Sequence, residues 1–230
     1  MTCAEPRATA RADQPARDWL SDPQAIYRQS FATIRAESDL SALSPADAEI
    51  AVRVIHACGM TDAAADLRFH GTPPLDVTGA VRGAVAAGRP VFVDTMMTRH
   101  AILARALPRA EQLRCTLNDP GVAEAARRDG LTRSAAAIQL WEPELAGAVV
   151  VVGNAPIALF YLLERLAAGA PRPAAILAFP VGFVGAAESK DALIAANMTD
   201  IAWVTLLGRR GGSAMAGAAL NGTLIGARDE

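Results

Sequence analysis

The chain has 230 residues, of which 52% are hydrophobic and 20% are charged, so it carries enough apolar material for a complete hydrophobic core. This composition excludes a disordered tail and a miniature scaffold. The formal net charge is -2, from 22 Lys and Arg against 24 Asp and Glu, and no basic stretch alternates with aromatic residues. We therefore expect no nucleic-acid partner.

The cysteine content and the apolar runs indicate the compartment. The three cysteines, Cys3, Cys58 and Cys115, are too few and too far apart for a disulfide framework or a zinc knuckle, as is typical of the reducing cytoplasm. The longest apolar stretch, 174–187, contains Pro180 and falls short of the roughly 18 residues that a membrane span needs. We expect a cytoplasmic protein without a membrane partner.

The first elements in chain order are a loose extension and two helices. Residues 1–21 lack an apolar signal core, and we expect them to form a flexible extension. A first helix is predicted over 23–38, behind the capping residue Asp22, and a second over 45–58, behind Ser44. Apolar residues recur at helical spacing in both, which predicts that the two helices pack together.

Five short apolar runs then alternate with helical segments, and each run is followed by a turn that contains Gly, Asn or Asp. Runs rich in Val, Ile and Ala without polar alternation are typical of strands that are covered on both faces. The sequence therefore predicts one α/β domain over 22–230, a three-layer α/β/α fold with a doubly wound parallel sheet. The predicted strands are 91–93, 114–117, 148–152, 174–179 and 201–206.

Three successive strand ends carry glycine-rich loops, at 149–156, 179–190 and 206–214. In an open parallel sheet such loops line one crevice, where N–H groups at helix starts favour anions. We interpret them as the site of a large ligand with several negative groups, although such loops also arise simply because strands must turn into helices. They do not fit GxGxxG, and Lys190 does not follow a Walker-type loop, which disfavours a nicotinamide or ATP enzyme.

His56 and Arg133 are candidate functional side chains outside these loops. His56 lies in the last turn of the second helix, where the helix dipole favours the protonated imidazole that a general acid needs. The alternative is a packed histidine bonded to a carbonyl. Arg133 follows Thr132 at an apparent helix start, so it either binds a ligand carboxylate or is a solvated surface arginine. No pair or triple of His, Cys and carboxylate has ligand spacing, and we expect no metal site.

Residues 188–190 and 209–210 allow more than one interpretation. Glu188, Ser189 and Lys190 suggest a serine–lysine nucleophile, but their adjacent placement favours a helix-capping segment. Adjacent arginines point in different directions, so we expect only one of 209–210 to bind an anion. Cys58 is most simply a core thiol.

Six segments of the chain, taken together, resemble one known family. They are IYRQSFATIRAE at 26–37, VIHACG at 54–59, TRSAAA at 132–137, VVGNAPIALFYLLE at 151–164, PVGFVGAAESKDAL at 180–193 and GRRGGSAMAGAALN at 208–221. In combination they resemble the precorrin-8X methylmutases of cobalamin biosynthesis, and the resemblance covers nearly everything after residue 22. The string PVGFVGAAESK with VGNAP upstream is its most specific part.

The resemblance implies a homodimer with a flavodoxin-like fold. Its expected activity moves a methyl group from carbon 11 to carbon 12 of precorrin-8X, giving hydrogenobyrinate, without a cofactor. By the resemblance, His56 occupies the proton donor and acceptor position, Ser30 a substrate-binding position and Arg133 a position near the reacting ring. The segment 97–102 departs from the family pattern, where glycine is expected in place of Ala101.

The residue pattern suits this chemistry. A [1,5] methyl migration around a conjugated ring needs no nucleophile, metal or electron carrier, only a held geometry and a group that adjusts ring protonation. A flat macrocycle fringed with carboxylates requires a broad apolar crevice, backbone donors and an arginine or two. With His56 as the catalytic residue, the predicted substrate-binding residues are Ser30, Arg133, Gly153, Asn154, Gly185, Gly212 and Ser213.

Other functions stay open at the level of sequence. A tetrapyrrole-binding carrier would keep the crevice without catalysis. An unrelated doubly wound enzyme that acts on a phosphorylated metabolite would also use glycine loops. Within the family, the substrate is either metal-free precorrin-8X or cobalt-precorrin-8, and the overall resemblance favours the metal-free substrate.

Overall fold

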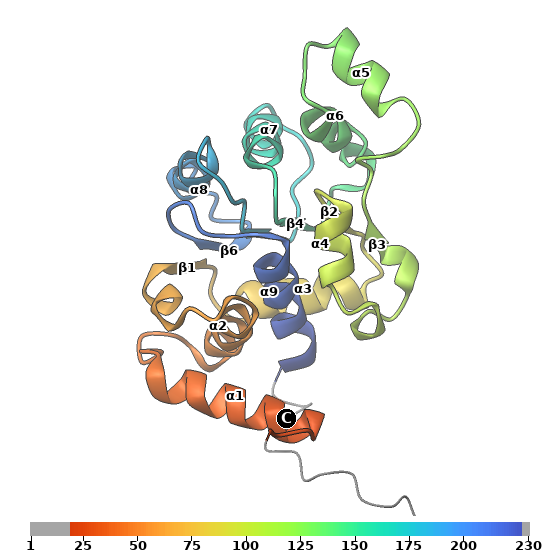
Figure 1. Cartoon of the computed structure of the whole chain (residues 1–230). Coiled ribbons are helices and arrows are strands. Elements are labelled where there is room, and N and C mark those ends of the chain that lie inside the picture. Colours follow the sequence, from red (N-terminus) through yellow and green to blue (C-terminus); the bar gives the residue numbers. More distant parts are fainter. Residues whose placement is uncertain (1–18, 227–230) are drawn as a thin grey trace, which may run out of the picture.

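Helices and strands alternate around one six-stranded sheet (Figure 1). The structure is a computed structural model that describes residues 19–226, so most of the predicted extension 1–21 lies outside the described residues. Its strands are β1 (Leu67–His70), β2 (Val91–Val93), β3 (Leu113–Arg114), β4 (Val149–Val152), β5 (Ala175–Ala178) and β6 (Ala202–Leu206). Its α-helices are α1 (Pro23–Glu37), α2 (Pro45–Cys58), α3 (Val77–Ala86), α4 (Met96–Ala101), α5 (Val122–Arg128), α6 (Arg133–Gln139), α7 (Pro156–Ala167), α8 (Ala186–Ala195) and α9 (Ser213–Ile225).

The strand order is β1-β6-β5-β4-β2-β3, and every pair except β1–β6 is parallel. Counted along the chain, the five parallel strands lie in the order 2-1-3-4-5, which is the flavodoxin-like order. The order in which the chain adds strands to the sheet reverses between β2 and β4. Loops at the carboxyl ends of these two strands therefore meet at the point where open α/β sheets form a crevice.

Alternate residues of each strand supply two separate apolar cores. On β4, Val149 and Val151 pack in the core shared with α2, α3 and α9, whereas Val150 and Val152 pack in the core shared with α7 and α8. All four side chains are fully buried. Figure 1 shows α7 and α8 on one face of the sheet and α2, α3 and α9 on the other. The predicted three-layer α/β architecture is confirmed.

The two N-terminal helices begin and end where local signals place them. The Asp22 carboxylate accepts the N–H groups of Gln24 and Ala25 at the start of α1, and the Ser44 hydroxyl accepts that of Asp47 at the start of α2. Gly59 ends α2 with φ 69° in the left-handed region. Helix α1 lies outside α2 (Figure 1). In residues 19–226 we find no helix long and apolar enough to cross a membrane.

The sheet differs from the prediction at one edge. Strand β1 was not expected and pairs antiparallel with β6, with Leu67 opposite Leu206, so the sheet is mixed rather than wholly parallel. Only Leu67 of its four residues is buried, because Arg68 and His70 interrupt the apolar run that marks the other strands. Its pairing depends on β6 being in place, which no local pattern reports. Strand β3 spans only Leu113–Arg114, so it begins earlier than the predicted strand 114–117 and shares only Arg114 with it.

Candidate active site

Helices α1 and α2 bring Ser30 and His56 together. The Ser30 hydroxyl oxygen lies 2.8 Å from His56 Nδ1, although the residues are 26 positions apart in the sequence. Ser30 is half-buried, and His56 is exposed. Because Nδ1 is bonded to Ser30, Nε2 is the ring nitrogen that remains for a ligand. A hydroxyl both donates and accepts, so Ser30 matches either tautomer of the imidazole.

Aromatic rings fix the plane of the imidazole. The Tyr27 ring lies 5.2 Å from the His56 ring with an interplanar angle of 32°, and the Phe31 ring approaches it edge-on at 5.3 Å. The guanidinium of Arg53 covers the Phe31 ring at 5.2 Å. Together with the Ser30 hydroxyl at Nδ1, the two rings restrict the orientation of the imidazole, which suits a proton-transferring group.

The surroundings of His56 favour the neutral imidazole. Partial burial lowers the pKa of His56 below its ordinary value of 6.5, and the positive charge of Arg53 one turn earlier lowers it further. Both effects oppose the helix dipole, which favours the protonated form.

The pair faces a cavity of about 470 Å³ between α1 and α2. Its walls combine apolar side chains with polar ones, among them the acid Glu37, and sites for organic ligands have both kinds of group. Among the residues that line it are Ile26, Ser30, Ile34, His56 and Thr61. His56 is thus open to a ligand, and the alternative of a packed histidine bonded to a carbonyl does not apply.

The three glycine loops lie side by side at the carboxyl edge of the sheet. The Gly182 N–H donates to the Arg209 carbonyl at 3.2 Å, and the Gly212 N–H donates to the Phe179 carbonyl at 2.8 Å. A Cβ at Gly153 would lie 2.8 Å from the Ser213 Cα, so the first and third loops pack tightly. The structure therefore brings these loops to one edge, as predicted from the parallel strands.

The N–H groups of the first loop, however, are already hydrogen-bonded to an acidic side chain of the protein itself. The buried carboxylate of Asp94, which follows β2, accepts the N–H groups of Gly153 at 3.0 Å, Asn154 at 2.7 Å and Ala155 at 2.8 Å. It also accepts the Thr98 hydroxyl at 2.8 Å. The N–H donors of Gly153 and Asn154, predicted to be free for a ligand, are held by the protein itself. An acid directly after an apolar strand at the switch point was the signal that could have revealed Asp94.

The other predicted loop residues are more open. Gly185 and Gly212 both have positive φ, and no atom outside the loop crowds Gly212. The Ser213 hydroxyl is half-buried and lies 3.0 Å from the Thr98 hydroxyl. Just before Gly185, Phe183 is 85% exposed and Val184 is 88% exposed. This edge of the sheet thus presents an apolar loop tip beside small polar residues.

Arg133 lies apart from His56 within one chain. It begins α6, and its guanidinium donates to the Leu117 carbonyl at 3.1 Å and to the Asn118 side chain at 2.7 Å. Figure 1 shows α5 and α6 at the opposite end of the molecule from α1. The predicted grouping of Ser30, Arg133 and His56 around one ring does not form within a single chain.

The remaining nucleophile candidates are occupied. The Ser189 hydroxyl donates to the Ala186 carbonyl at 3.1 Å and the Lys190 amine donates to the Arg210 carbonyl at 2.7 Å, so no serine–lysine pair forms. Burial raises the pKa of the Cys58 and Cys115 thiols, which keeps them in the less reactive protonated form. In the part of the chain that the structure describes, no three His, Cys, Asp or Glu side chains gather as metal ligands.

Fold and site together define a class: a three-layer α/β protein with parallel strands in the order 2-1-3-4-5 that presents an imidazole, paired with a hydroxyl, to a cavity at its two N-terminal helices. Such a pair is typical of enzymes that use acid–base chemistry.

Comparison with known proteins gives the particular family. The model of the CbiC family, precorrin-8X methylmutase, matches residues 25–225. The precorrin-8X methylmutase of Pseudomonas aeruginosa is 55% identical over 89% of this chain and 96% of its own length. The cobalt-precorrin-8 methylmutase of Salmonella typhimurium is 34% identical over 92% of this chain and 99% of its own length.

A solved structure agrees with these sequences. The precorrin-8X methylmutase of Thermus thermophilus superposes with a TM-score of 0.76 at 33% identity, covering 87% of this chain and 94% of that chain. The chain belongs to the precorrin-8X methylmutase family. This confirms the family that the six segments indicated.

Proposed function

We propose that this protein moves the methyl group of precorrin-8X from carbon 11 to carbon 12 and gives hydrogenobyrinate, with His56 as proton donor and acceptor. Membership of the family makes the chain a methylmutase, an isomerase of cobalamin biosynthesis. The observation that carries the role of His56 is its 2.8 Å contact with Ser30 at the wall of an open cavity.

The proposed chemistry follows from the state of the imidazole. Methyl migration shifts charge around the conjugated ring, and a neutral imidazole near pH 7 can both accept a proton and return it through Nε2. Ser30 holds Nδ1, which fixes the direction in which Nε2 points. Tyr27 and Phe31 prevent the ring from turning. The proposed step uses no cofactor, because the methyl group stays on the substrate throughout.

The carboxyl edge supplies contacts for the periphery of the macrocycle in this proposal. We assign Gly185, Gly212 and Ser213 to direct binding, since they are open or half-buried. We propose that Gly153 and Asn154 only shape the binding surface, because Asp94 already accepts their N–H groups. The apolar tip at Phe183 and Val184 suits the flat face of a macrocycle.

We further propose a homodimer in which a partner subunit completes the site. Arg133 lies far from His56 within one chain, and exposed apolar side chains lie on α1, where Ile26 is 43% and Tyr27 is 50% exposed. A second copy would cover such side chains and bring an arginine toward the cavity. Equimolar mixing of inactive His56→Ala and Arg133→Ala subunits, after dissociation and reassociation, should restore part of the activity. No restoration from a mixture of verified heterodimers contradicts a shared site.

The metal content of the substrate follows the closer relatives. The precorrin-8X methylmutases of Pseudomonas aeruginosa and Sinorhizobium are 55% and 51% identical to this chain, whereas the cobalt-precorrin-8 methylmutase of Methanocaldococcus jannaschii is 33% identical. We therefore propose metal-free precorrin-8X as the substrate. We also propose the cytoplasm as the location, because the cysteine content is typical of a reducing compartment. Comparing kcat/KM for the two substrates tests the first point, and higher efficiency with cobalt-precorrin-8 contradicts it.

The decisive test of the function is optical. Purified protein mixed with precorrin-8X should convert the absorption spectrum of the substrate into that of hydrogenobyrinate over many turnovers. A tetrapyrrole carrier would shift the spectrum once, on mixing, in proportion to the protein added. An enzyme of phosphorylated metabolites would produce no spectral change with precorrin-8X, and inorganic phosphate would compete with its true substrate.

A further inference from the structure

The chain contains a single lysine, and it is buried. Lys190 stands alone against 21 arginines in the whole sequence. It lies in the middle of α8, and its side chain is fully inaccessible to solvent. Burying an ammonium group costs free energy, and lysine is rarely found fully buried unless it is paired. The position of Lys190 therefore calls for a specific role.

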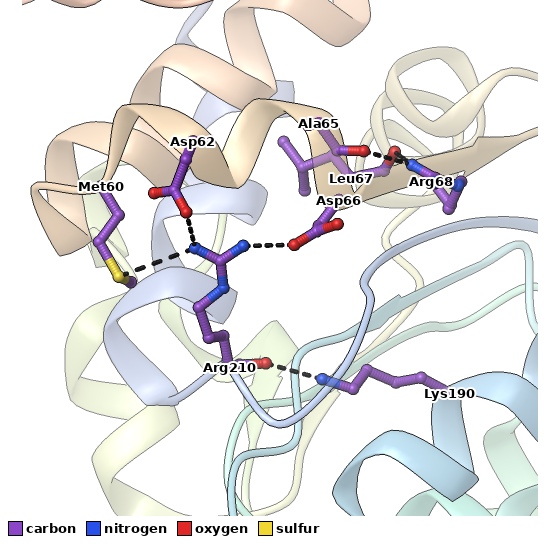
Figure 2. A network of polar contacts seen from close by, with 8 residues as sticks. All are labelled: Met60, Asp62, Ala65, Asp66, Leu67, Arg68, Lys190 and Arg210. Carbon is purple, nitrogen blue, oxygen red and sulfur yellow. Dashed lines mark hydrogen bonds and ion pairs between the residues drawn. The ribbon is translucent and has the colours of Figure 1, made fainter.

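Lys190 binds the third glycine loop from inside the protein. Its ammonium group donates a 2.7 Å hydrogen bond to the main-chain carbonyl of Arg210, in the loop at 207–212 (Figure 2). Burial lowers the pKa of Lys190 to about 8, so the amine is still mostly protonated at pH 7. A charged donor makes a stronger hydrogen bond to a carbonyl than a neutral one does.

Arg210 then connects this loop to the segment that follows α2. Its guanidinium donates to the Asp62 carboxylate at 2.8 Å and to that of Asp66, and it lies 4.0 Å from the Met60 sulfur. Figure 2 shows the Arg210 main chain facing Lys190 while its side chain points away toward Asp62 and Asp66. These partners belong to residues 60–66, directly after the helix whose last turn carries His56.

The same loop is attached to its neighbour at the sheet edge. The Gly212 N–H donates to the Phe179 carbonyl at 2.8 Å, and the Arg209 carbonyl accepts the Gly182 N–H at 3.2 Å. The loop is thus held at the end of β5, from within by α8, and by the segment after α2. Lys190 supplies the contact that fixes the main chain of Arg210 between the end of β5 and the segment after α2.

We infer that Lys190 is a positioning residue of the methylmutase site: through the Arg210 carbonyl it sets the third glycine loop relative to the His56 helix. This inference rests on the proposed function, since the loop and His56 must contact the same substrate. Lys190 does not touch the substrate itself, because it is enclosed in the core. A compact amine on a flexible stem suits a single carbonyl in a narrow space, whereas a guanidinium presents a planar fork.

The first test replaces Lys190 by methionine, which keeps the length of the side chain and removes its charge and donor. We expect Lys190→Met to weaken hydrogenobyrinate binding about tenfold in an absorption titration and to raise the KM for precorrin-8X by a similar factor. Its thermal unfolding midpoint should stay near wild type or rise, because no charge is buried. The control Leu193→Met, also buried on α8, should bind as wild type does.

A double-mutant cycle tests whether Lys190 acts through Arg210. Arg210→Ala keeps the carbonyl but releases Asp62 and Asp66, and it should also weaken product binding. If the two residues work as one connection, the double variant Lys190→Met/Arg210→Ala should bind no more weakly than the weaker single variant. Fully additive losses would overturn the connection.

The single lysine permits a test in the unaltered protein. The primary amines that an amine-directed reagent such as an N-hydroxysuccinimide ester can acylate are Lys190 and the chain N-terminus, and mass spectrometry separates the two sites. Saturating hydrogenobyrinate should slow labelling of Lys190 at least tenfold, because a ligand bound to the ordered loop suppresses its opening. An unchanged rate would overturn the inference even if Lys190→Met failed to fold.

These results distinguish the inference from the function on which it rests. Wild-type protein that neither converts precorrin-8X nor binds hydrogenobyrinate refutes both. Wild-type protein that does both, beside a folded Lys190→Met variant with wild-type affinity and KM, refutes only the role of Lys190.

Discussion

The α1–α2 surface and the carboxyl edge of the sheet both carry polar groups that could bind a ligand. At the first surface such a group is available, whereas at the second several are already hydrogen-bonded within the protein. At the helix pair, the His56 ring contacts Ser30 and still presents one nitrogen to a cavity. In the first glycine loop, the N–H donors that would attract an anion are hydrogen-bonded to Asp94. Polar groups at the correct edge of an α/β sheet are therefore not by themselves a binding site. Whether the protein has already satisfied them decides their role.

Substitutions in the two regions should therefore differ in their effect: a change at His56 should lower turnover, whereas a change at Asp94 should lower stability. Replacing His56 by alanine should lower kcat about 10² to 10⁴-fold, the usual contribution of a placed acid–base group. The dissociation constant for hydrogenobyrinate should change less than about threefold. Steady-state kinetics and an absorption titration measure the two quantities.

The matched control for His56 is another exposed histidine. His100→Ala, on α4, should leave both kcat and product binding at wild-type levels. Near-normal turnover in His56→Ala would show that His56 takes no part in the mechanism. The contrast between the two regions would then no longer hold.

The reverse result is expected at the sheet edge. Asp94→Asn places an amide N–H₂ among three N–H donors and a hydroxyl, and we expect it to lower the free energy of unfolding by about 3 kcal/mol. Turnover per folded molecule should fall only about threefold. Urea denaturation with parallel kinetics measures both, and Asp119→Asn, an exposed acid, is the control. A variant of wild-type stability but without activity would place Asp94 in the chemistry.

A smaller change sharpens the role of the hydroxyl. Ser30→Ala removes the partner of His56 Nδ1 and should lower kcat by up to about tenfold, since one hydrogen bond to a neutral group contributes about 1 kcal/mol. Ser30→Thr keeps the hydroxyl on the same helix face and should recover most of this loss. Equal defects in the two variants would indicate packing rather than orientation of the ring.

The smallest expected effect concerns pH. The lowered pKa of His56 means that the folded protein binds this proton less readily than the unfolded chain, so stability should fall as pH drops below about 6.5 toward the folded value. The acid limb of kcat/KM should lie in the same window. Arg53→Gln removes a nearby positive charge and should raise the pKa of His56, moving that limb to higher pH. An NMR titration of the imidazole measures the shift, and a fall in the pKa would contradict the assigned cause.

Much of the architecture was predictable because its signals are local. The caps Asp22 and Ser44 and the terminator Gly59 act on their own helices, so α1 and α2 begin and end close to their predicted bounds. The continuous Val runs predicted strands buried on both faces. The resemblance of six segments identified the family, since their combination is specific. Strand β1 escaped prediction because its pairing depends on β6, more than 130 residues later.

The sequence by itself determined the first two helices, the alternation of helices and strands, four strands and the approximate place of a fifth, the shared edge of the glycine loops and the family. Tertiary structure alone decided which polar groups are satisfied. Asp94 takes the N–H donors of a loop about 60 residues away, and helix α6, which Arg133 begins, lies at the opposite end of the molecule from α1. Periodicity and capping act over a few residues, whereas hydrogen-bond partners and burial depend on packing between distant elements. The lowered pKa of His56 and the buried position of Lys190 follow from that packing as well.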